Sequence, residues 1–137
     1  MSNLLRFSEK HVYDSTLEGI AVNVYLSAGR EKPIRILSRV DTGASHCLFE
    51  RQYADVLGFE VEAGDPRVFS TAVGRFRAYG HEVSIRVLDV EFASIVYFFA
   101  DDAIEKNVLG RRGWLDRVRI GIVDYESTLY LSPHDEA

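Results

Sequence analysis

The chain of 137 residues has a single cysteine, Cys47, and this scarcity excludes several kinds of structure. One cysteine cannot form an intramolecular disulfide or build a cysteine-rich zinc site. The four histidines lie far apart in the sequence and show no metal-ligand spacing. We therefore expect a fold without metal or organic cofactor, stabilised by its core, in a reducing compartment.

The sequence also lacks a long hydrophobic run and an excess of basic charge. Its longest uncharged apolar stretch, residues 92–100, has the length of a strand and is too short to cross a bilayer. Residues 1–6 lack the apolar core of a secretory signal peptide, which predicts a cytoplasmic protein. The formal net charge of −5 argues against nucleic acid or a membrane as a partner.

What the chain does contain is a succession of strand patterns. Hydrophobic residues make up 47% of the sequence, and no linker or internal repeat divides it. We therefore predict one all-β domain over residues 1–137, with its core at about 20–123 and a C-terminal hairpin at 119–131. The predicted strands are 20–26, 34–40, 68–70, 76–79, 81–90, 92–100, 119–123 and 127–131. The strand at 92–100 is apolar on both faces, as expected for a buried strand.

Helix signals are few. Residues 50–57 predict a short helix that stops at Gly58. Trp114, Leu115 and Val118 have helical spacing and predict a second short helix, with Trp114 in the core. Residues 64–66 predict a loop.

The five residues 41–45, Asp-Thr-Gly-Ala-Ser, follow the predicted strand at 34–40 and carry the chemistry. An acid on a tight turn, followed by a hydroxyl and a glycine, is what an aspartic protease needs at its catalytic loop. That chemistry requires two carboxylates facing each other. Because the chain has only one such triplet, it predicts a symmetric homodimer in which each subunit contributes one Asp41.

Four features, in this order, resemble the retropepsin-like (retroviral-type) aspartic protease family. The first is the triplet with Ala44, placed after an apolar strand. The second is a hairpin with its tip near Val73-Gly74, similar to the family's flap. The third and fourth are Val108-Leu109-Gly110-Arg111 and the helical pattern directly after it. The resemblance covers about residues 20–123 and implies a closed acid-protease-type barrel that works as a homodimer with a flap.

The resemblance also implies roles for individual residues. Asp41 is expected to be the catalytic acid and base. The active-site loop is expected to be supported by Thr42, Gly43 and Ala44. Substrate binding is expected of Gly43, Ser45, Val73, Gly74 and Val108. Structural bracing is expected of Leu109, Gly110 and Arg111. The implied substrate is an extended peptide, with apolar residues flanking the cut.

The chain departs from the family's pattern in several places. Ser45 stands where viral members usually have an aspartate that pairs with the arginine matching Arg111. The flap tip has one glycine, Gly74, where viral flaps have several, which favours a stiffer flap. The longer C-terminal tail predicts a dimer interface built by the extra hairpin. Ala44 offers no hydroxyl to stabilise the ionised dyad, so we expect a milder pH optimum.

Other interpretations remain open at this level. Asp41 could simply cap a turn, since this triplet is good turn chemistry. The domain could be a catalytically silent dimerisation or peptide-binding module. His46 and Cys47 are adjacent on a strand and point to opposite faces, which argues against a thiol-protease pair and predicts a buried Cys47. The arginines within 111–119 predict a solvated face with one structural ion pair.

Overall fold

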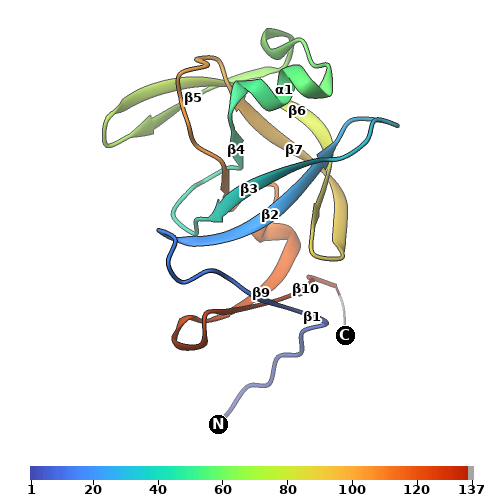
Figure 1. Ribbon diagram of the computed structural model, residues 1–137, viewed down its shortest axis with the longest axis vertical. Helices are drawn as coiled ribbons and strands as arrows, with labels where there is room; N and C mark the ends of the chain where they lie inside the picture. Colours follow the sequence, from blue (N-terminus) through green and yellow to red (C-terminus); the bar gives the residue numbers. More distant parts are fainter. Residues whose placement is uncertain (136–137) are drawn as a thin grey trace.

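The computed structural model describes residues 1–135, which form mainly strands in two sheets (Figure 1). The strands are β1 (Glu9–Val12), β2 (Ile20–Ser27), β3 (Ile34–Val40), β4 (Leu48–Phe49), β5 (Asp65–Thr71), β6 (Gly74–Val87), β7 (Val90–Phe99), β8 (Val108–Leu109), β9 (Val118–Val123) and β10 (Thr128–Pro133). The helical elements are α1 (Arg51–Leu57) and three 3-10 turns, Val61–Ala63, Leu115–Arg117 and Asp124–Glu126. The mainly β fold expected from the sequence is confirmed.

Two further points concern the extent of the chain. The domain predicted over residues 1–137 includes 136 and 137, which lie outside the described residues. Among residues 1–135, no helix has both the length and the apolar character needed to traverse a membrane.

The larger sheet closes on itself. Its strand order is β2-β3-β8-β4-β7-β6-β5, and β2 pairs with β6 as well. These pairings close a barrel from which β5 extends. β2 and β3 form the predicted hairpin, with Ile20 opposite Val40 and Leu26 opposite Ile34. Alternate residues of both strands are buried, because side chains on a strand alternate between its two faces.

β6 is longer than predicted and joins two predicted strands into one. It contains 76–79 and most of 81–90, and pairs with β5, β7 and β2. Both halves contain buried residues, such as Ala78 and Ile85, and the strand pairs with β7 without interruption from Ala78 to Val87. Val90 instead begins β7. The loop predicted at 64–66 is wrong for its last two residues, which begin β5 opposite Gly80 and Tyr79.

β7 is buried on both faces only in its second half. Residues 96–99 are buried, whereas Ile95 has 54% of its surface exposed. The prediction of an apolar strand buried on both faces therefore holds only beyond Ile95.

α1 confirms the predicted helix, which it matches within one residue. It ends at Gly58, whose φ of 83° lets its N–H return to the last turn. The second predicted helix is wrong: Trp114 has φ of −141°, and only the 3-10 turn Leu115–Arg117 follows. The apparent helical spacing instead reflects burial, because Trp114 and Val118 both reach the core from irregular or extended backbone.

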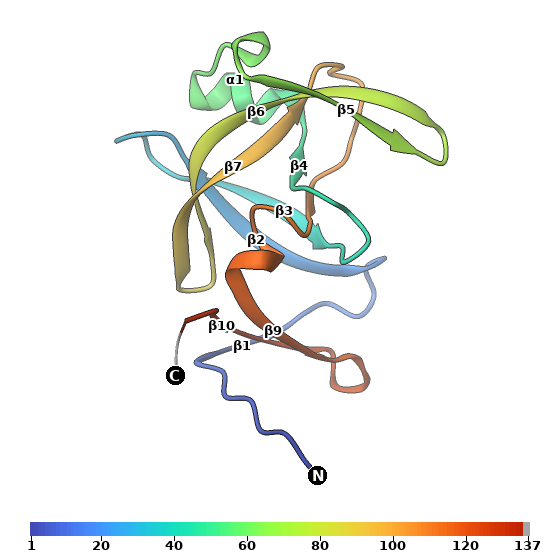
Figure 2. The same cartoon turned by 180° about the vertical axis from the view of Figure 1, so that it is seen from behind.

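A second sheet, of order β1-β10-β9, lies below the barrel in Figures 1 and 2. β9 and β10 form the hairpin predicted at 119–131, with Val118 opposite Pro133 and Val123 opposite Thr128. β1, for which the sequence gives no clear signal, pairs with β10. Leu129 and Leu131 of β10 belong to the same apolar cluster as the barrel residues, so the two sheets share one core.

Candidate active site

Asp41 lies at the end of β3, where β8 holds it in place. β3 and β8 run parallel, with Arg39 beside Val108 and Val40 beside Leu109. The backbone N–H of Asp41 then donates to the carbonyl of Leu109 at 2.9 Å. The side chain is half-buried, so a central strand delivers the carboxylate to a defined, accessible position.

The loop after Asp41 folds back onto its carboxylate. The N–H of Gly43 donates to Asp41 Oδ1 at 2.9 Å, and the N–H of Ala44 donates to the Asp41 carbonyl at 3.2 Å. A hydrogen bond to an ionised carboxylate is stronger than one between neutral groups. The loop therefore fixes the direction of the carboxylate, while the side chains of Thr42 and Ser45 remain exposed.

The segment after β8 lies directly against this loop. A Cβ atom at Gly110 would come within 2.1 Å of the His46 carbonyl oxygen and 2.8 Å of that of Ala44, so only glycine fits. The N–H groups of Arg111 and Arg112 donate to the carbonyls of Ala44 and Ser45, each at 2.8 Å. The structure thus brings the residues predicted as braces into contact with the loop, and Leu109 is fully buried beneath it.

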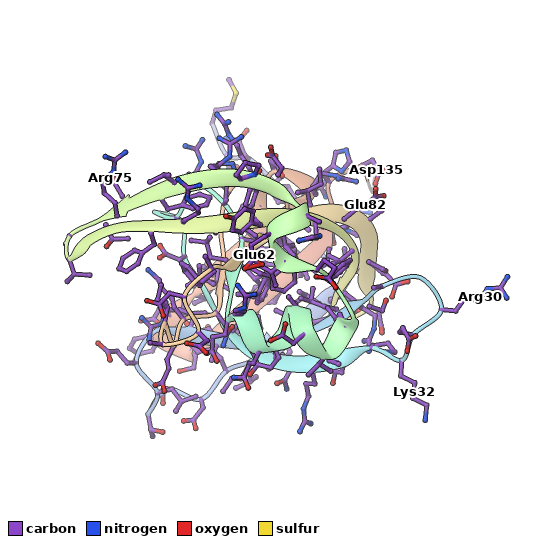
Figure 3. The ribbon with its side chains drawn as sticks, turned by 90° about the horizontal axis from the view of Figure 1, so that it is seen from above. Arg30, Lys32, Glu62, Arg75, Glu82 and Asp135 are labelled. Atoms are coloured by element: carbon purple, nitrogen blue, oxygen red, sulfur yellow. The ribbon has the colours of Figure 1, made fainter. Side chains whose placement is uncertain are left out.

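The hairpin of β5 and β6 projects on the same side of the molecule as the catalytic loop (Figures 1 and 2). Its tip is exposed: Val73 has 86% of its surface accessible, and Gly74 has φ of 147°. Thr71 Oγ1 accepts from the Val73 N–H at 3.3 Å and donates to the Gly74 carbonyl at 3.2 Å. Figure 3 shows Arg75 near this tip, where the hairpin extends beyond the barrel.

An apolar hollow of about 390 Å³ lies under the flap tip. Its lining residues are Leu48, Phe69, Thr71, Ala72, Val73, Phe76, Phe99, Ile104, Glu105 and Lys106. Val73 therefore lines the hollow together with Thr71 and Ala72. Val108 is only 2% exposed and packs in the apolar cluster that also contains Leu48, Phe69 and Phe99.

His46 also lies in this region. The sequence suggests only one role for it, as the partner of a reactive Cys47 thiol, and argues against that role. Its ring makes edge contacts with Phe69 and Tyr97, each at 5.3 Å between centroids, and its Nδ1 lies 2.9 Å from Ser45 Oγ. Burial, followed by the nearby charges of Arg67 and Arg112, lowers the pKa of His46. No sequence pattern predicts these contacts, because Tyr97 and Phe69 come from distant strands.

Cys47 is fully buried, as predicted. Burial raises the pKa of its thiol to about 12, so the thiolate that a nucleophile requires is disfavoured. In the described part of the chain, no group of three or more His, Cys, Asp or Glu side chains could hold a metal ion.

The predicted arginine cluster is largely solvated. Arg111, Arg112 and Arg117 are exposed. The ion pairs found within residues 1–135 are Arg51–Glu62 and Arg86–Glu91. Neither pair includes Arg111, Arg112 or Arg117. Within residues 1–135, these three arginines therefore do not form the structural ion pair that was expected for the cluster.

Comparisons with known proteins agree with this geometry. The aspartyl protease family model matches residues 22–113. A retropepsin-like aspartic protease from Rickettsia conorii superposes with a TM-score of 0.61 at 19% identity, covering 90% of this chain and 97% of that one. The EIAV protease complexed with the inhibitor HBY-793 gives a TM-score of 0.53 at 17% identity, covering 73% and 88%. No curated protein matches the chain. The family match spans most of the chain, and the fold is that of the retropepsin-like proteins, so this chain belongs to the aspartyl protease family.

Proposed function

We propose that this protein is an aspartic endopeptidase that hydrolyses peptide bonds with a water activated between two Asp41 carboxylates, one from each subunit of a homodimer. The observation that carries the proposal is the Asp41 carboxylate itself. It stands at the end of a barrel strand, held by the Gly43 N–H, on the side of the molecule to which the flap projects. A group that only capped a turn would need neither the flap nor the bracing from β8.

The chemistry follows from pairing two such carboxylates. Two carboxylates a few ångströms apart cannot both ionise easily, so they share a proton. The ionised carboxylate takes a proton from the water, and the protonated one polarises the scissile carbonyl. Water then attacks directly, without a covalent enzyme intermediate.

The neighbouring residues take supporting roles in this proposal. The exposed Thr42 hydroxyl bonds across the two-fold axis, and Gly43 accepts a hydrogen bond from the substrate backbone. Val73 and Gly74 close over an extended peptide, which adds as a strand to the flap. The hollow beneath the flap favours an apolar side chain near the cut, because most of its lining is apolar.

We place the dimer contact on the side to which the catalytic loop projects. The turn between β9 and β10 projects to the same side (Figures 1 and 2). Near its tip, Val123 and Tyr125 have 40% and 101% of their surfaces exposed. Tyr13 donates to Asp124 Oδ1 at 2.5 Å, which anchors this turn to the preceding segment. Exposed apolar side chains on a well-held turn suit the centre of an interface.

The proposal is tested by comparing the wild type with Asp41→Asn on a diverse peptide mixture from pH ~4 to ~7, the range in which such dyads titrate. Mass spectrometry reads the cut sites, and analytical ultracentrifugation gives the oligomeric state. We expect two dimeric proteins, of which only the wild type cleaves. Asp55→Asn, on the exposed face of α1, is the matched control and should cleave normally.

Two outcomes would contradict the proposal. Equal cleavage by the wild type and Asp41→Asn would remove Asp41 from the chemistry. An intact dimer that binds peptides but cleaves none would instead support a catalytically silent peptide-binding module.

A further inference from the structure

His46 lies where the catalytic loop meets the flap strand. It directly follows the loop, and its ring contacts Phe69 of β5 and Tyr97 of β7. A peptide lying between the loop and the flap, as the proposed function requires, would pass close to this ring. The charges around His46 therefore bear on which substrates can bind.

Arg67 approaches this point from the flap. It is two residues before Phe69 on β5, so both side chains point to the same face of the strand. Its Nε donates to Tyr97 Oη at 3.2 Å, and its guanidinium carbon lies 5.7 Å from the centroid of that ring. Tyr97 Oη in turn donates to Asp65 Oδ2 at 3.0 Å. The guanidinium is thus oriented through one nitrogen, while its two terminal nitrogens have no partner among residues 1–135.

Arg112 is also held next to His46. Its backbone pairs with the catalytic loop, through an isolated bridge to His46 and an N–H donated to the Ser45 carbonyl at 2.8 Å. The Arg112 side chain is exposed. Burial has the largest effect on the pKa of His46 and lowers it; the charges of Arg67 and Arg112 lower it further and that of Asp116 raises it, so these charges act on the same small region.

Two acidic groups near this rim already accept hydrogen bonds. Asp65 is engaged by Tyr97, and Asp116 Oδ1 accepts the Gly113 N–H at 3.0 Å. An open hollow of about 470 Å³ extends from His46 past Tyr97 and Arg112, with Glu82 and Asp116 on its wall. His46 and Arg112 line this space, and Arg67 lies beside it through its contact with the Tyr97 ring.

We propose that Arg67, Arg112 and His46 form a subsite for an acidic substrate residue, an aspartate or glutamate a few positions from the cleaved bond. The inference rests on the proposed function and specifies its substrate: a peptide with an apolar residue under the flap and a carboxylate between the two arginines. Guanidinium groups suit this task, because they donate paired hydrogen bonds to a carboxylate. The protein carries a net charge of −5 overall, so the attraction is local to this rim.

The test uses pairs of peptides taken from the observed cut sites, identical except for glutamate or glutamine at one position at a time. We expect wild-type kcat/KM to be roughly tenfold higher for glutamate at one position. Arg67→Gln and Arg112→Gln should each bring the ratio of kcat/KM for the glutamate peptide over the glutamine peptide close to one. Arg77→Gln is the matched control, because Arg77 is an exposed flap arginine on the outward face, opposite Val68.

Binding to the Asp41→Asn protein provides a second measurement that needs no turnover. Fluorescence anisotropy should show tighter binding of the glutamate peptide, and added salt should reduce the difference. A glutamate preference that is absent, or that persists in both arginine variants, overturns the subsite. If neither peptide is cleaved but the glutamate preference in binding remains, the proposed activity fails and the subsite stands.

Discussion

The loop that carries Asp41 and the tip of the β5–β6 hairpin, which we propose as the catalytic loop and the flap, project to the same side of the molecule but are built in opposite ways. Around the loop, the backbone N–H groups of Asp41, Arg111 and Arg112 are all used in hydrogen bonds, and Gly110 leaves no space for a methyl group. At the flap tip, a Cβ on Gly74 would meet nothing within 4 Å. A closely packed loop can hold a carboxylate in one position, whereas an exposed hairpin with few contacts can open and close.

The largest expected effect comes from Gly110→Ala. The added methyl group would collide with two backbone carbonyl oxygens, which cannot move without displacing the catalytic loop. We expect a loss of more than about 4 kcal/mol in the free energy of unfolding, or failure to fold. Urea unfolding followed by circular dichroism measures the change.

Gly29→Ala is the control for this substitution. Gly29 has a positive φ, 61°, and no atom lies within 4 Å of the position that the added methyl group would take. The substitution should cost only the strain of the left-handed conformation, about 1–2 kcal/mol. Similar losses for both variants would show that packing against the loop is not what requires glycine at position 110.

Leu109→Ala should have the next largest effect. Leu109 is fully buried next to the catalytic loop, so the substitution leaves a cavity and should cost about 3 kcal/mol, within the usual range for buried leucine. Val68→Ala on the flap, where 43% of the residue's surface is exposed, should change stability by no more than about 0.5 kcal/mol. Urea unfolding measures both changes. The comparison would be contradicted if Val68→Ala proved less stable than Leu109→Ala.

The loop and the flap tip should also differ, by a smaller amount, in how fast a thiol reacts in each. Cys47 is buried just after the catalytic loop, and its thiol pKa is raised to about 12 by that burial. At pH ~8, where a thiol reagent needs the thiolate, Cys47 should react at least about 100-fold more slowly than a cysteine at the exposed flap tip. That ratio corresponds to about 2.7 kcal/mol.

The comparison thiol is Ala72→Cys in a Cys47→Ala background, and Ellman's reagent measures both rates. Because Cys47 is the only cysteine in the chain, its signal reports on the loop alone. Rapid reaction of Cys47 in the folded protein would mean that the loop opens as readily as the flap.

The sequence predicts β3 and the loop that carries Asp41 better than it predicts the rest of the fold, and the reason is physical. β3 and the acid-bearing turn are encoded locally, by apolar alternation followed by turn residues, and both lie where expected. α1 and its glycine stop are similarly local. The spacing of Trp114, Leu115 and Val118 was misleading, because residues three and four apart can also be buried one by one from irregular backbone.

Long-range contacts account for what the sequence could not predict. β1 is short and half exposed, and it forms only because β10 offers it an edge. The sequence predicts separate strands at 76–79 and 81–90, since nothing local shows that one strand, β6, serves both the flap and the barrel. The contacts of His46 with Phe69 and Tyr97 depend on three strands meeting in the closed barrel, so no short motif could indicate the basic rim.

The smallest expected effect on stability belongs to Val73→Ala, at the flap tip. Its surface is 86% exposed, so removing two carbon atoms should change the free energy of unfolding by less than about 0.5 kcal/mol. If the flap closes over a peptide, however, those atoms become buried at about 0.8 kcal/mol each, and kcat/KM should fall by up to about 15-fold. An unchanged kcat/KM would mean that Val73 does not meet the substrate. A loss of activity at constant stability is the signature of a flap that acquires its contacts only when it closes.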